Sequence, residues 1–415
     1  MGLVDSFVKV GTVKPEFEVA DVIRQYGDAY RRKYHVSWEQ KKAMRDMVRC
    51  RTSALGGYVE ECDTCGRLRI RYCPCKNRNC PKCGAFKKAQ WLVKQQVKLL
   101  PGPYFHVIFT IAHEVNELAN VTPSTIFDLL FHTAADMLKA YALKYLGGET
   151  GFTMVLHTWS QTMSKHIHVH CIVWGGALGK GKRGARVRTS KKTFLFQAQD
   201  LAKDFRNEFC RRLRKMHKKG KLDMAAEVAE VDVEAMIKKI ESKLWNVFIK
   251  PAPSDPKELC KYLGRYVRGI AISNYRILSI KRGRVRFKYC DNRDGGKEKV
   301  MSLPAVEFLR RFLQHVLPSR FVRVRHYGLH HSSKREDRDL IRQLMGKDEK
   351  EPTEAPKLDL GEWLQSFLPE GQDPRQCPFC ENGRMYLRTE FEGFSPLKAA
   401  LLSMLGIPVR GVAPG

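Results

Sequence analysis

The feature that most constrains this fold is a cluster of cysteines in the first quarter of the chain. Seven of the thirteen cysteines lie between residues 50 and 83. A chain without an export signal uses such a cluster for a metal ion more readily than for disulfides. Two C-x-x-C knuckles stand 14 residues apart, which is enough for a hairpin that joins them, and four thiolates suit the tetrahedral geometry of zinc. We therefore predict one structural zinc ribbon with the ligands Cys62, Cys65, Cys80 and Cys83.

The remaining cysteines of this region have no assigned role. Cys50, Cys73 and Cys75 either compete for the same ion or contribute to a second one. Near the end of the chain Cys377 and Cys380 form a lone CPFC knuckle, which needs ligands from elsewhere to close a zinc site. His330 and His331 are candidates, and an ordinary turn is the alternative.

A short run of histidines predicts a second kind of metal site. In SKHIHVHCIVW the histidines alternate with apolar residues. Side chains of a strand repeat every two residues, so His166, His168 and His170 share one face, opposite the face of Ile167 and Val169. Imidazoles on one strand face can hold a divalent cation, although such alternation also occurs in simple packing.

A pair of tyrosines follows on a predicted helix. PKELCKYLGRYVRGIA, residues 256–271, begins with a proline that Ser254 or Asp255 can cap. Tyr262 and Tyr266 stand four residues apart and therefore on one helix face. A phenol is a poor nucleophile at its ordinary pKa of about 10. It can attack a phosphodiester if a divalent cation offsets the charge that develops.

Charge indicates the class of partner. Lys and Arg outnumber Asp and Glu by 74 to 44, and the net charge of +30 favours a polyanion, with nucleic acid ahead of an anionic membrane surface. The 415 residues suggest two or three domains. No apolar stretch reaches the roughly 18 residues of a membrane span, and the N-terminus lacks a signal-peptide core. We expect a cytoplasmic protein.

The order of elements predicts an α+β fold. Helices are expected over 18–49, 84–99 and 123–146, the last with Ser124 as a candidate N-cap. The strand 106–111 and the histidine strand flank the third helix, so a central antiparallel sheet fits. His106 and His113 flank the first strand, each as a ligand or as a polar cap.

Several basic segments are candidate contacts for nucleic acid. Residues 180–192 hold seven basic residues and no acidic one, and a basic helix follows; this stretch is either an insertion facing nucleic acid or a solvated loop. Basic side chains also lie between the cysteines and on the expected strand 321–328. The predicted DNA contacts are Arg69, Lys76, Arg78, Lys82, Arg323 and Arg325.

Taken together, these blocks resemble a known family. The order CRTSALGGYV, CDTCG, CKNRNCPKC, HVIFTIAHE, SKHIHVHCIVWGG, KYLGRYVRGIA, FVRVRHYG and CPFC is similar to the two-tyrosine HUH transposases of rolling-circle insertion sequences, the insertion sequence ninety-one group. The resemblance covers about residues 45–385. It implies an HUH endonuclease core, RRM-like, with a central antiparallel sheet and helices on one face, plus an N-terminal helical and zinc-ribbon module.

The resemblance also implies roles for individual residues. His168 and His170 fall on the metal-binding pair, with Mg²⁺ or Mn²⁺ as the catalytic ion. His166 is a third ligand or supports the pair, although Gln161 or a residue of the tyrosine helix can serve instead. Tyr262 and Tyr266 fall on the two nucleophiles, which form 5′-phosphotyrosine links with single-stranded DNA at element ends and target sites in a bacterial nucleoid. Zn²⁺ is structural.

Two other functions fit the same blocks. An HUH replication initiator or relaxase would use the same chemistry, and a non-catalytic zinc-ribbon nucleic-acid-binding protein would need no nucleophile at all.

The expected organisation is an N-terminal helical segment 1–46, a zinc-binding DNA-contact domain 47–98, an HUH domain 99–300 with a basic insertion at about 178–252, a C-terminal helix and strand 301–345, and a linker and tail 346–415.

Overall fold

The computed structural model describes residues 15–182, 184–222, 232–267, 270–347, 350–352, 357–359, 361, 373, 375–380 and 382–393. Residues 1–14 of the expected N-terminal segment and most of the expected tail 346–415 lie outside the described residues. The helices are α1 (Val19–Lys33), α2 (Trp38–Arg49), α3 (Ala85–Gln96), α4 (Asn116–Val121), α5 (Pro123–Leu146), α6 (Ala198–Lys218), α7 (Val233–Glu241), α8 (Pro256–Val267), α9 (Ala305–Leu313) and α10 (Arg335–Leu344). The strands are β1 (Gly57–Cys62), β2 (Leu68–Tyr72), β3 (Tyr104–Thr110), β4 (Gly151–Trp159), β5 (Lys165–Trp174), β6 (Gly176–Gly181), β7 (Gly184–Thr189), β8 (Val247–Ala252), β9 (Ile277–Lys281), β10 (Arg284–Asp291), β11 (Lys297–Pro304), β12 (Val324–Gly328) and β13 (Met385–Phe391).

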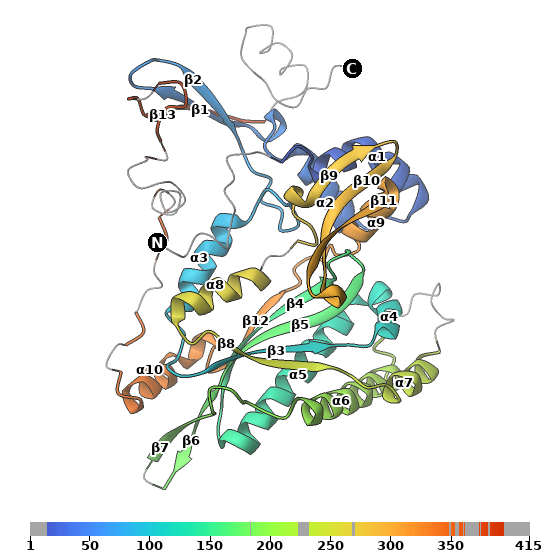
Figure 1. Cartoon of the computed structure of the whole chain (residues 1–415), viewed down its shortest axis with the longest axis vertical. Helices are drawn as coiled ribbons and strands as arrows, with labels where there is room; N and C mark the ends of the chain where they lie inside the picture. Colours follow the sequence, from blue (N-terminus) through green and yellow to red (C-terminus); the bar gives the residue numbers. More distant parts are fainter. Residues whose placement is uncertain are drawn as a thin grey trace.

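A five-stranded sheet lies at the centre of the molecule (Figure 1). Its order is β12-β4-β5-β3-β8, and every neighbouring pair is antiparallel. The predicted α+β class with a central antiparallel sheet is confirmed. Among the described residues no helix is both long and apolar enough to cross a membrane.

One face of this sheet packs on α5, α6 and α7. Alternate residues of the strands, such as Phe105, Val107, Val169 and Cys171, are fully buried against these helices. The helix α5 begins at Pro123 after Thr122, so the expected cap at Ser124 is wrong. Proline suits the first helical position because its missing N–H would have no partner there.

The opposite face of the sheet is covered as well, which corrects the expectation of helices on one face only. The helices α3, α8 and α10 pack over Tyr104, Ile172 and Trp174 at one end of the strands. These strands are apolar on both faces at that end, and a face of this kind needs a cover. Towards the other end the same face carries histidines instead.

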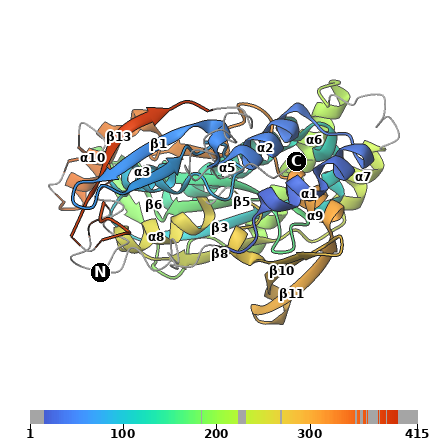
Figure 2. The same ribbon diagram turned by 90° about the horizontal axis from the view of Figure 1, so that it is seen from above.

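A second core joins the N-terminal helices to the region 271–313. The N-terminal helices α1 and α2 pack with α9 and with the antiparallel sheet β11-β10-β9. Figure 2 shows β10 and β11 projecting beside α9, away from the central sheet. The segment 18–49 is therefore helical, as predicted, and its apolar face is buried by residues more than 250 positions away in the chain, such as Asn274, which accepts a hydrogen bond from Val19 N.

The basic stretch after β5 divides into two parts. The strands β6 and β7 pair as an antiparallel hairpin, on which Arg186 and Arg188 are exposed. The helix α6 and the strand β8 belong instead to the core and to the edge of the central sheet. The region 178–252 is thus not an insertion throughout. Residues 183 and 223–231 of it lie outside the described residues.

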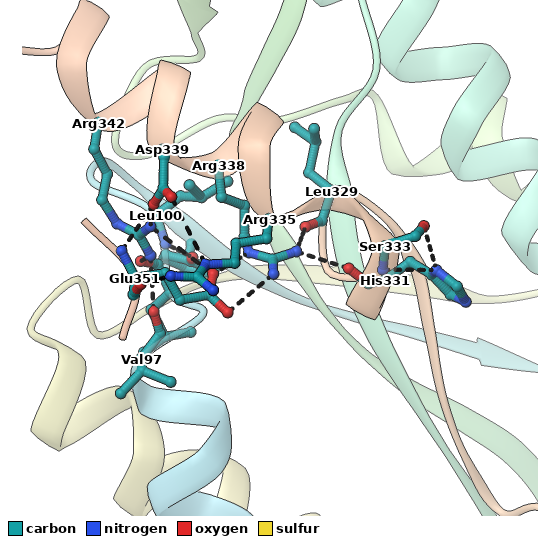
Figure 3. A network of polar contacts seen from close by, with 12 residues as sticks. Val97, Leu100, Leu329, His331, Ser333, Arg335, Arg338, Asp339, Arg342 and Glu351 are labelled. Atoms are coloured by element: carbon teal, nitrogen blue, oxygen red, sulfur yellow. Dashed lines mark hydrogen bonds and ion pairs between the residues drawn. The ribbon is translucent and has the colours of Figure 1, made fainter. Parts of the chain in front are cut away.

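A buried ionic network fixes the start of the C-terminal segment (Figure 3). Arg338 of α10 holds the carboxylate of Glu351 with nitrogen–oxygen distances of 2.6 and 3.0 Å. Arg335 donates to the carbonyl of Glu351, and Arg342 donates to the carbonyls of Val97 and Leu99 after α3. Arg338 is 1% exposed, so each of its donors needs such a partner. The network ties residue 351 to α10 and α10 to the end of α3.

Candidate metal and nucleophile site

Three buried histidines meet on the face of the central sheet opposite α5, α6 and α7. His157 of β4 lies opposite His168 of β5 in the antiparallel register, and both face the same side as His170. Each offers one ring nitrogen, and these atoms lie within 4.8 Å of one another. The arrangement follows from the short turn at residues 160–164, which returns the chain beside itself. The hairpin alone therefore assembles a three-imidazole cluster.

Hydrogen bonds orient two of these rings. His168 Nδ1 donates to the carbonyl of His166 at 2.8 Å, and His157 Nε2 donates to the carbonyl of Tyr266. Each ring therefore keeps the lone pair on its other nitrogen, since a neutral imidazole carries one proton. Burial lowers the pKa of His168 to about 4 and lowers those of His157 and His170 well below the ordinary value. All three rings are neutral at pH 7, as metal ligands must be.

The donor set indicates what kind of ion fits. Three neutral imidazoles form a nitrogen-rich site, which suits Mn²⁺, Zn²⁺ and similar ions better than the oxygen-seeking Mg²⁺. The third member is His157, whereas the sequence suggested His166. The side chain of His166 is exposed, and this residue contributes its backbone carbonyl to His168 instead.

Both tyrosines of α8 lie against this cluster. The helix begins at Pro256 and Asp255 Oδ1 accepts from Glu258 N, which confirms the predicted cap. The ring centroids of Tyr262 and Tyr266 are 5.2 Å apart, on one face of the helix. The ring of Tyr266 lies 4.4 Å from that of His170.

His106 links the nucleophile candidates to the histidine cluster. It lies within β3 rather than at the strand end, and its Nδ1 is 2.7 Å from Tyr262 Oη. Its Nε2 is 2.8 Å from His170 Nδ1. Burial, with smaller contributions from the charges of Lys250 and His168, lowers the pKa of His106 to about 3. The imidazole is therefore neutral and makes one hydrogen bond on each side.

Two basic side chains bring positive charge to this site. Lys250 Nζ of β8 lies 5.5 Å from the ring centroid of Tyr262. Arg323 is half-buried, and its charge lowers the pKa of His157, although less than burial and His168 do. A phosphate group beside Tyr262 would meet favourable charge here.

The cysteines form two four-membered clusters among the described residues. One consists of Cys50, Cys75, Cys80 and Cys83, and the other of Cys62, Cys65, Cys377 and Cys380. Neighbouring sulfur atoms in these clusters lie 3.4 to 3.8 Å apart. Four sulfurs at about 2.3 Å from a zinc ion lie about 3.8 Å apart, so both clusters fit Zn²⁺.

This grouping corrects the predicted ribbon. Cys62 and Cys65 sit at the tip of the hairpin β1-β2, whereas Cys80 and Cys83 lie beyond its base, beside Cys50. A six-residue strand spans about 20 Å, so the cysteines at the tip of the hairpin cannot share an ion with those at its base. The tip is completed by the CPFC knuckle, because β13 pairs with β1.

The cluster at the hairpin tip is tightly packed: a Cβ at Gly383 would collide with Cys62 Sγ, so this position requires glycine. The other candidate ligands lie elsewhere. His330 is buried against Tyr104 and Thr153, and His331 bonds Ser333, so neither serves the knuckle. Cys73 belongs to neither cluster.

Comparisons with known proteins agree with these two regions. Residues 22–111 match the family described as "Transposase zinc-binding domain", and residues 151–337 match the family described as "Putative transposase". A relative in Sinorhizobium fredii, "Putative transposase y4qJ", is 38% identical over 386 residues, which cover 91% of this chain and 96% of the relative. The chain belongs to the two-tyrosine transposases of the insertion sequence ninety-one group.

A second member of this transposase family is more distant. The "Transposase for insertion sequence element IS801" of Pseudomonas savastanoi pv. phaseolicola is 26% identical over 356 residues, which cover 82% of this chain and 81% of the relative. No solved structure matches the chain. The zinc-binding match contains Cys50 to Cys83 but ends long before Cys377 and Cys380.

Most of the basic residues expected to contact DNA in this transposase have partners within the chain. Arg78 donates to the carbonyls of Pro318 and Phe321 at 2.7 Å each. Lys82 pairs with Glu18, Arg69 pairs with Glu60, and Arg325 pairs with Asp128. Lys76 is exposed. Arg78 and Lys82 join the zinc-binding region to the segment after α9 and to the start of α1, whereas the pairs of Arg69 and Arg325 each lie within one region. Their binding to DNA stays a prediction.

Two residues of the transposase site were not assigned from sequence, and both left a signal. His157 stands in HTWSQTMSKHIHVH, where a tight turn at 160–164 places it beside His168. His106 lies two residues from Tyr104 and from Ile108, so it shares their face of the strand. The pairing of β3 with β5 places it beside His170.

Proposed function

We propose that this transposase nicks and rejoins single-stranded DNA through covalent phosphotyrosine intermediates on Tyr262 and Tyr266. The observation that supports this most directly is the position of Tyr262 Oη, 2.7 Å from His106, whose other nitrogen is 2.8 Å from His170 of the histidine cluster. A buried contact between a phenol and a metal-type site is what nucleophilic attack on a phosphodiester needs.

The chemistry is a balanced exchange of esters. Tyr262 Oη forms a bond to phosphorus, and the bond from phosphorus to the 3′ oxygen breaks. The phenolic proton passes to water, and the departing 3′ oxygen takes a proton from water to become a free hydroxyl. The 5′ end stays on the protein, so the energy of the phosphodiester is kept for a later rejoining without ATP.

Two tyrosines make sense for such a sequence of steps. While one holds the first cleaved 5′ end, the other can attack a second strand. The rings of Tyr262 and Tyr266 lie 5.2 Å apart and both contact the histidines, so one cluster can serve both.

The residues that would hold the catalytic ion are His157, His168 and His170. A bound divalent ion there acts as a Lewis acid that polarises the scissile phosphate and offsets its developing charge. The nitrogen-rich donor set makes Mn²⁺ the better ion of the two expected, Mn²⁺ and Mg²⁺.

Basic residues supply the proposed path for the DNA. Lys250 is half-buried beside Tyr262, and Lys76 is exposed in the zinc-binding region. Arg186 and Arg188 are exposed on the hairpin β6-β7, whose position Figure 1 shows. The proposed substrates are single strands from the element ends and the target site.

A covalent-adduct assay tests this function. The purified chain is incubated with labelled single-stranded DNA that spans its own element's end, with Mn²⁺ or with EDTA, and run on a denaturing gel. We expect a metal-dependent adduct that each single change, Tyr262→Phe or Tyr266→Phe, weakens and the double change abolishes.

Two other outcomes would contradict the proposal. An adduct that persists in the double variant would place the nucleophile elsewhere. Tight binding of a verified cognate end with no adduct under any metal would favour the alternative of a non-catalytic zinc-containing DNA-binding protein.

A further inference from the structure

A continuous chain of hydrogen bonds leads from Tyr262 through three histidines to a backbone carbonyl. Tyr262 Oη lies 2.7 Å from His106 Nδ1, and His106 Nε2 lies 2.8 Å from His170 Nδ1. His170 Nε2 lies 3.1 Å from His168 Nε2, and His168 Nδ1 lies 2.8 Å from the carbonyl of His166. Every ring nitrogen of these three histidines takes part.

The carbonyl fixes the direction of the whole chain when no ion is bound. A carbonyl only accepts, so His168 carries its single proton on Nδ1 and accepts on Nε2. His170 must then donate from Nε2 and accept on Nδ1, and His106 must donate from Nε2 and accept on Nδ1. The last acceptor receives the hydroxyl proton of Tyr262. In this state Tyr262 is held as a hydrogen-bond donor, which disfavours its phenolate.

We propose that His106 is a positioning residue that couples Tyr262 to occupancy of the metal site. When His168 and His170 give their Nε2 lone pairs to a divalent cation, the hydrogen bonds that His106 makes exchange donor and acceptor. Tyr262 then accepts a hydrogen bond instead of donating one. This inference rests on the proposed function. His170 then carries its proton on Nδ1 and donates to His106 Nε2, and His106 carries its proton on Nδ1 and donates to Tyr262 Oη.

The reversal conserves protons. The single protons of His170 and His106 each move from Nε2 to Nδ1, and the hydroxyl proton of Tyr262 turns away from His106. All three rings stay neutral, in line with the lowered pKa values that burial gives them. A donor aimed at Tyr262 Oη stabilises the phenolate, so the nucleophile becomes competent only when the ion is present.

The chain singles out Tyr262 from Tyr266. The ring of Tyr266 packs on those of His106 and His170, with centroids 4.5 and 4.4 Å apart, and its backbone carbonyl accepts from His157. The bond from His106 Nδ1 goes to the hydroxyl of Tyr262. We therefore assign the metal-gated cleavage to Tyr262.

Nuclear magnetic resonance tests the reversal without any DNA. Protein labelled with ¹⁵N-histidine and already carrying zinc in both cysteine clusters is titrated with one further equivalent of Zn²⁺, which is diamagnetic. Long-range ¹H–¹⁵N correlations, assigned with His106→Asn, show which nitrogen of His106 bears the proton. We expect it to move from Nε2 to Nδ1. A proton that stays on Nε2 while calorimetry shows the third ion binding would overturn the inference.

Adduct formation in single-tyrosine chains tests the assignment to Tyr262. His106→Ala is placed in Tyr266→Phe, which leaves Tyr262, and in Tyr262→Phe, which leaves Tyr266. We expect a loss of about 10–100-fold in the first chain, at least about tenfold greater than in the second. His106→Asn, whose amide N–H sits near the position of Nδ1, should restore more of the Tyr262 reaction than His106→Gln.

The outcomes separate this inference from the function on which it rests. Equal losses in the two chains, or equal rescue by the Asn and Gln variants, would mean that His106 only supports packing. No adduct from either parent single-tyrosine chain, together with the expected proton shift, would overturn the proposed function and leave the reversal standing.

Discussion

The histidine site and the composite cysteine cluster assemble in opposite ways. His157, His168 and His170 come from one hairpin, β4-β5, and their approach needs only a tight turn and the two-residue repeat of strands. The second cysteine cluster joins Cys62 to Cys380, which are 318 positions apart. The histidine site needs only the contacts of one hairpin, whereas the cysteine cluster exists only after β13 has paired with β1. The first should therefore respond to local changes and the second to the arrangement of the whole chain.

The largest expected effect is on the local site. His168→Ala removes one of three imidazoles and leaves the Nε2–H of His170 without its acceptor. The ion's stabilisation of the phosphate is worth several kcal/mol, so adduct formation should fall by roughly 10²–10³-fold. The denaturing-gel assay measures this, with His113→Ala, an exposed histidine outside the cluster, as the matched control. Full activity of His168→Ala would remove the basis for the metal site.

The next effect concerns the composite cluster. Cys377→Ser with Cys380→Ser should lower bound zinc from two ions per chain to one, because two of four ligands are lost from one of the two clusters. Mass spectrometry of the native protein measures the zinc, and limited proteolysis should show cleavage around β1-β2. Cys73→Ser, outside both clusters, should keep both ions. Retention of both ions by the double variant would instead support the ribbon of Cys62, Cys65, Cys80 and Cys83 predicted from spacing.

A smaller effect is expected on stability as the pH changes. Burial lowers the pKa of His168 to about 4, below its ordinary value of about 6.5. Between these values the unfolded chain binds more protons than the folded one, so the free energy of unfolding falls as pH drops from about 6.5 towards 4. Each such histidine contributes at most about 1.4 kcal/mol per pH unit.

Urea unfolding of the wild type and of His168→Asn, without added Mn²⁺, isolates this contribution. Both proteins lose zinc from their cysteines in acid, and the comparison cancels that shared loss. The variant should show the shallower dependence on pH. Identical slopes would mean that His168 titrates normally in the folded chain, in conflict with its burial.

The smallest effect is expected on the hairpin β6-β7. Arg186→Ala with Arg188→Ala removes two exposed charges and should weaken single-stranded DNA binding a few-fold. The slope of log affinity against log salt should become shallower by about 1.4, at about 0.7 for each lost phosphate contact. Fluorescence anisotropy over a salt series measures both, and the exposed pair Arg31→Ala with Arg32→Ala on α1 is the control. An equal change in the control would indicate only a loss of net charge.

The same difference between local and long-range contacts decides which features the sequence predicted correctly. The strand of His168 and His170, the helix from Pro256 with its Asp255 cap, and the shared face of Tyr262 and Tyr266 are all periodic or local, and the structure has them. Spacing failed for the cysteines because Cys80 is close to Cys62 in the chain, yet the stiff hairpin β1-β2 separates its tip from its base. The sequence could not show the partners of Arg78 and Arg325 for a related reason, since the contacts of a basic residue depend on what packs against it.

By itself, the sequence determined the class of the protein: an α+β chain with a histidine strand, a two-tyrosine helix and cysteines for zinc, in an order that marks a transposase family. Side-chain periodicity and ligand chemistry act over a few residues, so a linear pattern is enough to show them. Only the tertiary structure decided that His157 completes the histidine cluster, that His106 joins Tyr262 to it, and that CPFC closes the zinc site of β1-β2. These contacts depend on which strands pair and in which register, and pairing is chosen by the burial of the whole chain rather than by any segment of it.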